Sequence, residues 1–504
     1  MTTKKETMLL IGYISGSLYL LCMIAMSLYG LNAMVTAILF IRAKRSLKQE
    51  QSTPEPEEWP KVTIQLPVFN EKYMLERLLW AVTQLDYPLD RLQIQVLDDS
   101  TDDTALLSAR LVEEYRARGF NIECIFRTDR GGYKAGALKK GLETASGELV
   151  AIFDADFIPS SDWLKKTVPQ FQNPKLGCLQ TRWGHTNREY NLLTRAQALA
   201  MDGHFVVEQT ARSRNHLFMN FNGSAGIWRR SSIEDAGGWQ TDTLTEDFDL
   251  SFRAQLRGWM VDFLPDVIVP AELPASVEAF KKQQSRWAKG SIQVARKVAK
   301  LLFSQPDIPP YKRIAGLLLL TAYMVYPLMI VMLLLTLPVG LLAPRFFTIF
   351  PISILATFGP PMLYALAGAR GTPSLMGRIK ILPVLTVIGF GISLNTAIAI
   401  MEALIGKGGT FVRTPKLNLT NNPNSTGQID RSYLQPISPI VWGEIGLSLY
   451  ALLTIALLEP RLGWVIVPWM GVYWLGYFYV ASLNLYQHWQ AQYSGRSFAI
   501  NEQT

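Results

Sequence analysis

Two aspartates separated by one residue follow an apolar run in this sequence. Asp154 and Asp156 come directly after residues 149–153, a run that is typical of a buried strand. Carboxylates so close together repel each other unless a cation joins them. Mg²⁺ is commonly held by one or two carboxylates together with substrate phosphates. The pair therefore predicts a site for a divalent cation and a phosphate-bearing ligand.

A second acidic pair, Asp98 and Asp99, closes the apolar run 92–97 and is followed by a serine and a threonine. These residues have a simple structural explanation, because Asp and Ser side chains cap the helix that follows a strand. A ligand-binding role is the alternative, and the pattern alone leaves both open.

A glycine-rich turn leads into a predicted helix at residues 131–136, and Lys134 lies at the start of that helix. Backbone N–H groups at a helix N-terminus attract phosphate, and the ammonium group of a lysine adds a point charge. The spacing fits neither the Walker A pattern nor the dinucleotide-binding fingerprint. We therefore expect binding of a nucleoside diphosphate group and not hydrolysis of ATP.

Two further motifs carry acids and an arginine. Thr-Glu-Asp at 245–247 opens a helix, where acids favour the positive end. A carboxylate that faces a cleft from such a position can also accept the proton of an attacking hydroxyl. Gln-Gln-Ser-Arg-Trp at 283–287 lies in a basic amphipathic helix, which by itself predicts an interfacial helix at a membrane.

The elements that position these residues alternate between strands and helices. Strands are predicted at 62–66, 92–97, 122–126 and 149–153, and helices are predicted to begin at Glu71, Thr101 and Lys134. Such alternation predicts an α/β domain with a mainly parallel sheet, flanking helices, and ligands at the carboxyl ends of the strands.

Uncharged runs on both sides of this domain are long enough to cross a bilayer, which takes roughly 20 residues. The first is 7–41, and the cations that follow it keep the next segment in the cytosol by the positive-inside rule. The later runs are 314–344, 346–369, 381–401, 437–458, which carries the single charged residue Glu444, and 462–487. Because the loops before and after the third of these are both basic, residues 381–405 are expected to be re-entrant or interfacial. Asn395 and Glu402 would then face water or the protein, and an ordinary span is the alternative.

The predicted organisation of the chain places one cytosolic domain between membrane segments. In order, we expect a transmembrane helix at 1–42, a linker at 43–60, the cytosolic domain at 61–275, interfacial helices at 276–313, a transmembrane hairpin at 314–370, a re-entrant or interfacial helix with a loop at 371–431, a second hairpin at 432–487 and a cytosolic tail at 488–504.

Composition supports a membrane protein. Only 18% of the 504 residues are charged and 49% are hydrophobic, whereas soluble domains carry about 25% charged residues. Disorder and a purely soluble enzyme are therefore excluded. Basic cytosolic loops and a phosphate-bearing ligand explain the net charge of +8, and no nucleic-acid partner is expected.

The order of these motifs resembles a known signature. Asp-Asp-Ser at 98–100, Asp-Ala-Asp at 154–156, Thr-Glu-Asp at 245–247 and Gln-x-x-Arg-Trp at 283–287 resemble the motifs of processive family 2 glycosyltransferases, the group of cellulose, hyaluronan and chitin synthases. Residues 94–102, 132–136, 153–157 and 221–229 are similar to the plant cellulose-synthase-like A and C types, which make mannan or glucomannan and the glucan backbone of xyloglucan. The resemblance covers nearly all of residues 60–300. It implies a GT-A type α/β domain inserted between transmembrane helices.

The resemblance also implies roles for individual residues on the donor side. Those expected to bind the nucleotide sugar are Asn70, Glu71, Asp98 or Asp99, Lys134, Asp154, Gln283 and Arg286. Asp154 and Asp156 would hold Mg²⁺ or Mn²⁺. Residues 411–416 resemble the gating loop of cellulose synthase, and through this likeness Thr414 and Lys416 would contact the bound nucleotide, although Arg413 and Pro415 depart from the family's pattern.

On the acceptor side, the resemblance makes Asp247 the general base, with Glu246 and Asp156 beside it in the catalytic set. Trp287 would form the floor under the acceptor sugar, and Trp183 is expected to contact the acceptor as well. An acceptor hydroxyl would lose its proton to Asp247, attack the anomeric carbon of the nucleotide sugar and yield a β-glycoside with inversion.

Donor and acceptor both stay open between alternatives. The donor is UDP-glucose or GDP-mannose. The product is either a β-1,4-linked polysaccharide that crosses the membrane or a single sugar on a lipid such as diacylglycerol or ceramide. A scaffold with a decayed domain is the third class, and the intact acids disfavour it. The expected location is an integral, multi-pass membrane protein with a cytosolic catalytic domain, in a bacterial inner membrane or, in a eukaryote, the Golgi.

Overall fold

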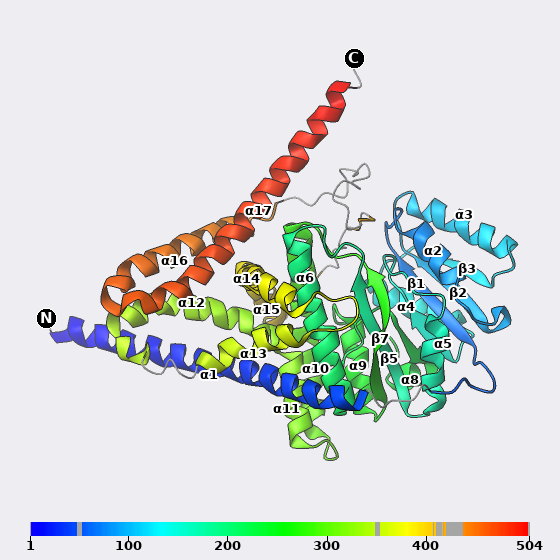
Figure 1. Ribbon diagram of the computed structural model, residues 1–504, viewed down its shortest axis with the longest axis horizontal. Helices are drawn as coiled ribbons and strands as arrows, with labels where there is room; N and C mark the ends of the chain where they lie inside the picture. The colour runs from blue at the N-terminus through cyan, green and yellow to red at the C-terminus, as the bar shows by residue number, and fades with distance from the viewer. Residues whose placement is uncertain are drawn as a thin grey trace.

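Seven strands form one sheet, and in the sequence they lie between the first long helix and the helices after residue 275. In Figure 1 the sheet is at the right, and most of the later helices lie to its left. The structure, a computed structural model, describes residues 2–47, 53–347, 353–406, 408–409, 416, 418–419 and 437–501. The strands are β1 (Val62–Val68), β2 (Leu92–Asp98), β3 (Ile122–Phe126), β4 (Leu149–Ile152), β5 (Leu176–His185), β6 (Gly226–Arg229) and β7 (Met260–Ala271). Their order in the sheet is β3-β2-β1-β4-β6-β5-β7, and β6 runs antiparallel to both of its neighbours.

Helices connect the parallel strands and cover the sheet, because parallel neighbours need a crossover connection. Within the domain they are α2 (Leu75–Thr83), α3 (Thr104–Ala117), α4 (Tyr133–Thr144), α5 (Trp163–Thr167), α6 (Leu192–Asp202), α7 (Thr210–Arg214), α8 (Arg230–Asp235) and α9 (Glu246–Leu256). A π-helical segment, η3 (Gly203–Gln209), joins α6 to α7, and the 3-10 turns are η1 (Leu89–Arg91) and η2 (Val168–Gln172).

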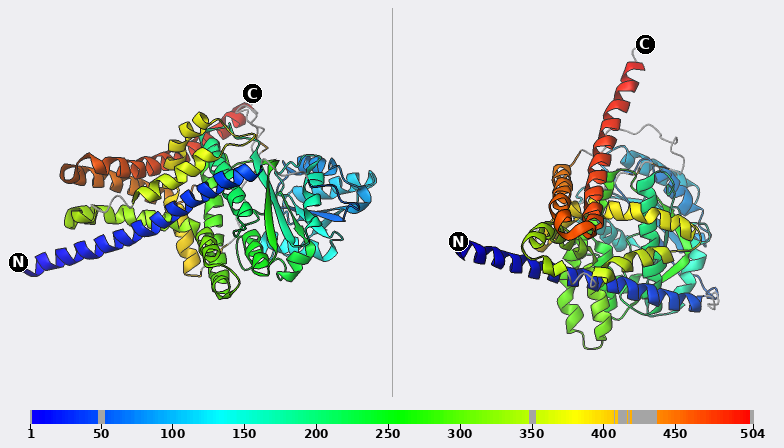
Figure 2. Two further views of the ribbon diagram at one scale, coloured as in Figure 1. Left: turned by 60° about the horizontal axis from the view of Figure 1, so that its bottom comes forward. Right: turned by 60° about the vertical axis from the view of Figure 1, so that its left-hand side comes forward.

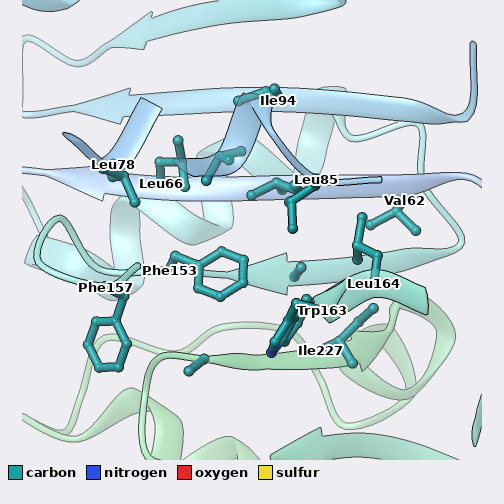
Figure 3. Close-up of a cluster of buried hydrophobic side chains, with 14 of the residues drawn as sticks. Val62, Leu66, Leu78, Leu85, Ile94, Phe153, Phe157, Trp163, Leu164 and Ile227 are labelled. Carbon is teal, nitrogen blue, oxygen red and sulfur yellow. The ribbon is translucent and has the colours of Figure 1, made fainter. Parts of the chain in front are cut away.

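The core of the domain is built from alternate residues of the central strands. Val62, Ile64 and Leu66 of β1 are fully buried on one face, as expected for a strand whose side chains alternate between faces. Phe153 and Trp163 pack edge to face beneath them, with ring centroids 4.8 Å apart (Figure 3). This packing fixes the ends of β1 and β4, from which the acidic residues project.

The strand order reverses direction next to β1. The chain passes from β1 outward to β2 and β3 and then returns to place β4 on the other side of β1. In open α/β sheets, ligands bind at the carboxyl ends of strands at such a switch point. The loops after Val68 and Ile152 are therefore the expected walls of a ligand site.

The remaining helices extend away from the sheet as a bundle (Figure 2). They are α1 (Thr2–Leu47), α10 (Val277–Ser304), α11 (Pro310–Leu320), η4 (Ala322–Met324), α12 (Val325–Leu342), α13 (Ser353–Leu366), α14 (Leu375–Gly391), α15 (Ser393–Leu404), α16 (Ile440–Leu462), η7 (Gly463–Val465) and α17 (Ile466–Asn501). Among the described residues, three helical stretches are long and apolar enough to span a bilayer: Lys5–Lys44, Ala322–Leu342 and Ile440–Gln490.

Helices α14 and α15 pass the same test only together, and they are bent by 46° where they meet. Asn395 of α15 donates a hydrogen bond to the carbonyl of Lys281 at 2.9 Å, and Glu402 pairs with Lys289 at 2.9 Å. Both polar side chains thus face α10, as expected from the sequence. The re-entrant or interfacial placement of this segment stays a prediction.

The observed elements lie close to the predicted ones in the first half of the domain. Helices α2 and α3 begin at Leu75 and Thr104, three or four residues later than predicted. The delay after β2 has a local cause, because Asp98 Oδ1 accepts the Ser100 N–H and Asp102 Oδ1 accepts the Thr104 N–H, which form turns before the helix.

Candidate active site

A cavity of about 710 Å³ opens at the carboxyl ends of β1 and β4 and continues to the helices of the bundle. At one end its walls include Phe69, Asp99 and Lys134, which lie on or near the first strands. At the other end they include Tyr326 of α12 and Phe390 of α14. One continuous space therefore joins the switch point of the sheet to helices of the candidate membrane region.

The two aspartates after β4 line this cavity, and each binds a lysine. Asp154 accepts a hydrogen bond from Lys134 of α4, whose Nζ also donates to the Gly223 carbonyl at 2.7 Å. Asp156 is buried, and its Oδ2 accepts from Lys416 Nζ at 2.8 Å and from the Glu272 N–H at 2.9 Å. Burial works to lower the pKa of Lys134, but Asp154, Glu246 and Asp247 raise it overall. Lys134 is therefore a protonated cation placed among carboxylates.

Asp247 lines the cavity at the start of α9, and it lies near Lys134. Burial and the charge of the neighbouring Glu246 raise the pKa of Asp247 to about 7, against the opposing influence of Lys134 and Arg286. Burial also raises the pKa of Glu246, again against Lys134. A carboxylate with a pKa near 7 is suited to accept a proton at neutral pH.

Gly223 makes the space that Asp247 needs. Its φ of +83° is a conformation that residues with a side chain rarely adopt. A Cβ at this position would lie 2.7 Å from Asp247 Oδ2 and 3.5 Å from Lys134 Nζ. The loop after residue 220 thus brings backbone directly against the candidate base.

The amphipathic helix α10 brings the Gln-x-x-Arg-Trp residues to the same cavity. Gln283, Arg286 and Trp287 all line it. Burial lowers the pKa of Arg286, while Glu246 and Asp154 oppose that effect. Trp183 of β5 also lines the cavity, and its indole N–H donates to the Ser224 carbonyl at 3.1 Å. The two tryptophans assigned to the acceptor therefore share one space with the candidate base.

The structure separates the two acids after β2. Asp99 lines the cavity and forms a two-point ion pair with Arg127. Asp98 is buried and accepts from the Ser108 hydroxyl and the Ser100 N–H, so it does not face the cavity. Adjacent side chains at a strand end point in opposite directions. Asp98 thus closes the turn after β2 and does not cap α3, which begins only at Thr104. Of the two acids, only Asp99 lines the cavity, and its contact with a ligand stays a prediction.

Of the other residues predicted to bind the donor, some line the cavity and others do not. Glu71 lines the cavity, whereas the Asn70 side chain accepts the Thr101 N–H at 2.8 Å and joins the loops after β1 and β2. Lys416 lines the cavity beside Asp156. Thr414, Arg413 and Pro415 lie outside the described residues.

Several residues of the cavity received no role from the sequence. The guanidinium of Arg130 lies 3.3 Å from the centroid of the Phe69 ring at the donor end. His204, Glu208 and Asn222 form a hydrogen-bonded polar group that also lines the cavity. Arg130 directly precedes the glycine-rich turn and could have been considered with it. The other three come from segments that only the fold brings together.

The chemistry of the two aspartates fits a divalent cation. They offer hard carboxylate oxygens on one wall of the cavity, and a lysine ammonium already occupies a position beside each of them. Among the described residues, no group of three or more His, Cys, Asp and Glu side chains could hold an ion. The protein thus supplies two carboxylates, and a substrate diphosphate and water would complete the coordination.

Sheet order, the reversed strand β6 and the acids at the strand ends define a GT-A type glycosyltransferase domain. Residues 60–290 match the model of the family described as "Glycosyltransferase like family 2". The matched segment contains all four motifs that resemble those of family 2 glycosyltransferases.

The chain is also similar in sequence to curated plant enzymes. The chain is 40% identical over 292 residues to glucomannan 4-beta-mannosyltransferase 1 of Cyamopsis tetragonoloba, covering 56% of each chain. It is 43% identical over 261 residues to probable glucomannan 4-beta-mannosyltransferase 4 of Oryza sativa subsp. japonica, covering 51% of this chain and 48% of the relative. The chain thus spans about half the length of the curated relatives it matches.

Among solved structures, the mannosyltransferase PcManGT from Pyrobaculum calidifontis, in complex with GDP-Man and Mn²⁺, aligns with a TM-score of 0.49 and 23% identity. The alignment covers 76% of this chain and 98% of that chain.

Proposed function

We propose that this protein is an inverting β-1,4-mannosyltransferase that transfers mannose from GDP-mannose to a growing polysaccharide and passes the chain into the membrane. The relatives named as glucomannan 4-beta-mannosyltransferases support mannose as the sugar. They also favour GDP-mannose over UDP-glucose, because the cellulose-synthase-like A resemblance carries that donor.

The observation that carries the proposal is the continuous cavity. Lys134, Asp154 and Asp247 line it near the strand ends, and Tyr326 and Phe390 line it at the helical bundle. A hydroxyl-bearing chain that enters from the bundle side reaches Asp247 without leaving the cavity. An elongated product could leave through the same space, between helices α12 and α14.

The catalytic step follows from the residues around Asp247. As general base, Asp247 takes the proton of the acceptor hydroxyl, and the oxygen then attacks the anomeric carbon. Lys134 and Arg286 provide positive charge where the leaving diphosphate gains negative charge. Trp287 holds the acceptor ring by stacking against its apolar face. Lys416, which binds Asp156, adds a second ammonium group to the wall that carries the two aspartates.

Mg²⁺ or Mn²⁺ would be held by Asp154 and Asp156 and would neutralise charge on the diphosphate. Membrane lipid would surround the exposed apolar side chains of α1, α12 and α16. The cations Arg42 and Lys44 at the end of α1 support a cytosolic position for the catalytic domain. A bacterial inner membrane or a Golgi membrane fits this arrangement.

Labelled donors test the proposal directly. Purified protein in lipid nanodiscs would receive labelled GDP-mannose or UDP-glucose with Mg²⁺ or Mn²⁺, and the products would be divided between organic and water-insoluble fractions. We expect label from GDP-mannose in a water-insoluble product that a β-1,4-mannanase digests. Label that enters the organic phase as a one-sugar lipid would show that the acceptor is a lipid and not a polysaccharide. Transfer from UDP-glucose alone would refute GDP-mannose as the donor.

A further inference from the structure

One side of α10 carries a stripe of polar residues that faces away from the cavity. Its four members follow one another at spacings of three, four and four residues, so they lie on the same side of the helix. None of them is among the described residues that line the cavity. The members of this polar stripe are Glu278, Lys281, Ser285 and Lys289.

Each member of the polar stripe has a polar partner on a helix of the bundle. Lys281 Nζ lies 2.7 Å from Glu444 Oε1 of α16, and the two side chains are 1% and 0% exposed. The other three contacts, in chain order, are Asn484 Nδ2 of α17 to Glu278 Oε2 at 3.1 Å, Asn395 Nδ2 of α15 to Ser285 Oγ at 2.7 Å, and Lys289 Nζ to Glu402 Oε2 of α15 at 2.9 Å. Four consecutive contacts therefore join α10 to three different helices of the bundle.

The opposite side of α10 carries residues of the candidate active site. Arg286 and Trp287 line the cavity, and they lie about one and a half helical turns beyond Lys281. Further along this side, α10 packs closely against the Thr-Glu-Asp motif, since a Cβ on Gly290 would lie 2.6 Å from Thr245 Oγ1. The rotation and the height of α10 therefore decide whether Arg286 and Trp287 face the cavity.

Apolar contacts alone would define this rotation and height poorly. A slide of one helical turn, about 5.4 Å, exchanges one apolar contact for a similar one. The same slide would separate Lys281 from Glu444 and leave two buried charges without partners, which is strongly unfavourable. Specifying the register between packed helices is the best-attested use of buried polar residues.

We propose that the polar stripe fixes the register of α10 against the bundle, and that Lys281 and Glu444 are positioning residues for Arg286 and Trp287. The inference rests on the proposed glycosyl transfer and adds residues through which the bundle holds the site in shape. Neither Lys281 nor Glu444 lines the cavity. Their loss should therefore act through misplacement of Arg286 and Trp287, which lowers kcat.

The first test separates position from stability. The double variant Lys281→Met with Glu444→Leu replaces the ion pair by apolar side chains of similar volume, a change that often leaves stability intact. We expect this variant to keep nearly the wild-type Tm and to lose at least about tenfold in kcat with GDP-mannose. The swapped pair, Lys281→Glu with Glu444→Lys, restores the attraction and should return kcat to within about threefold of the wild type.

A milder variant tests the same register without changing a charge. Asn395→Leu removes the hydrogen bonds to Ser285 Oγ and to the Lys281 carbonyl, and kcat should fall at least about threefold. Lys300→Met is the matched control, because Lys300 is exposed on the same helix and lies outside the polar stripe. Its kcat should equal that of the wild type.

A distance between two spin labels tests the register without the reaction. The labels are attached at the exposed positions of Lys300→Cys on α10 and Lys139→Cys on α4, in a chain that carries Cys124→Ser. We expect the measured distances to shift or broaden by several Å, up to the roughly 5.4 Å of one turn, in the apolar double variant, and to return in the swapped pair.

Unchanged distances in the apolar double variant would overturn the inference. Wild-type kcat in that variant or in Asn395→Leu would overturn it as well, and so would a folded swapped pair that stays as slow as the apolar one. A wild-type protein that turns over no nucleotide sugar would instead refute the proposed function, and the label distances would still test the register of α10.

Discussion

The rate of transfer should follow the ionisation of Asp247. Burial and Glu246 raise the pKa of Asp247 to about 7, and a general base acts only in its ionised form. With that pKa, about one-eleventh of the enzyme is ionised at pH 6 and about ten-elevenths at pH 8. The kcat/KM for the donor should therefore rise about tenfold between these two pH values.

Replacement of Glu246 by Gln tests the cause of this pKa. The change removes a negative neighbour that raises the pKa of Asp247, so the acidic limb of the pH profile should move to lower pH. A fall of about one pKa unit would reduce the ratio of kcat/KM at pH 8 to that at pH 6 from about tenfold to about twofold.

The assay measures initial rates of nucleotide release from GDP-mannose in nanodiscs over a range of about pH 5.5 to about pH 9. His216→Gln is the control, because His216 is exposed and lies outside the cavity lining, so the pH profile should keep the wild-type position in this variant. A flat profile between pH 6 and pH 8 would refute the reasoning. So would a limb that moves to higher pH in Glu246→Gln.

Three further substitutions give separate outcomes. Asp247→Asn should reduce transfer by about 10²-fold to 10⁴-fold and raise the Tm at pH 8. The Tm should rise because an acid whose pKa is higher in the folded state than in the unfolded state destabilises the fold once the pH exceeds its unfolded-state pKa. An unchanged rate of transfer would contradict the assignment of Asp247 as the base. Gly223→Ala should reduce the rate of transfer at least about 10-fold, because the added Cβ would displace the Asp247 carboxylate. The donor KM would be measured in the same assay. Wild-type kinetics would contradict this prediction, since they would show that the loop accommodates the Cβ. Lys281→Met should lower the Tm in detergent by leaving Glu444 unpaired, since the two side chains are 1% and 0% exposed and 2.7 Å apart, a loss of about 3 to 5 kcal/mol. The double variant with Glu444→Leu should recover most of that loss, and a double variant as unstable as the single one would contradict this account.

The first half of the sheet could be predicted because its apolar runs alternate with helical segments. Each of β1 to β4 ends at or within two residues of its predicted end, and the acids that follow β4 line the cavity as expected. The later strands gave a weaker pattern. β6 has only four residues and pairs with segments that lie far away in the sequence.

The sequence could not decide which of two adjacent acids faces a ligand. Asp98 and Asp99 have the same side chain, but the alternation of the strand turns one toward Ser108 and the other toward Arg127 and the cavity. It also could not reveal the cluster of His204 and Asn222. These residues are 18 positions apart, and neither belongs to a motif whose spacing indicates a shared site.

The central claim is that the transfer site continues into the membrane as a path for the product. The most direct measurement uses sealed vesicles with the catalytic domain outside, GDP-mannose added to the outside, and β-1,4-mannanase added after synthesis. We expect most of the labelled polymer to resist the enzyme until detergent opens the vesicles. Polymer that is fully digested in intact vesicles would contradict the path through the helices.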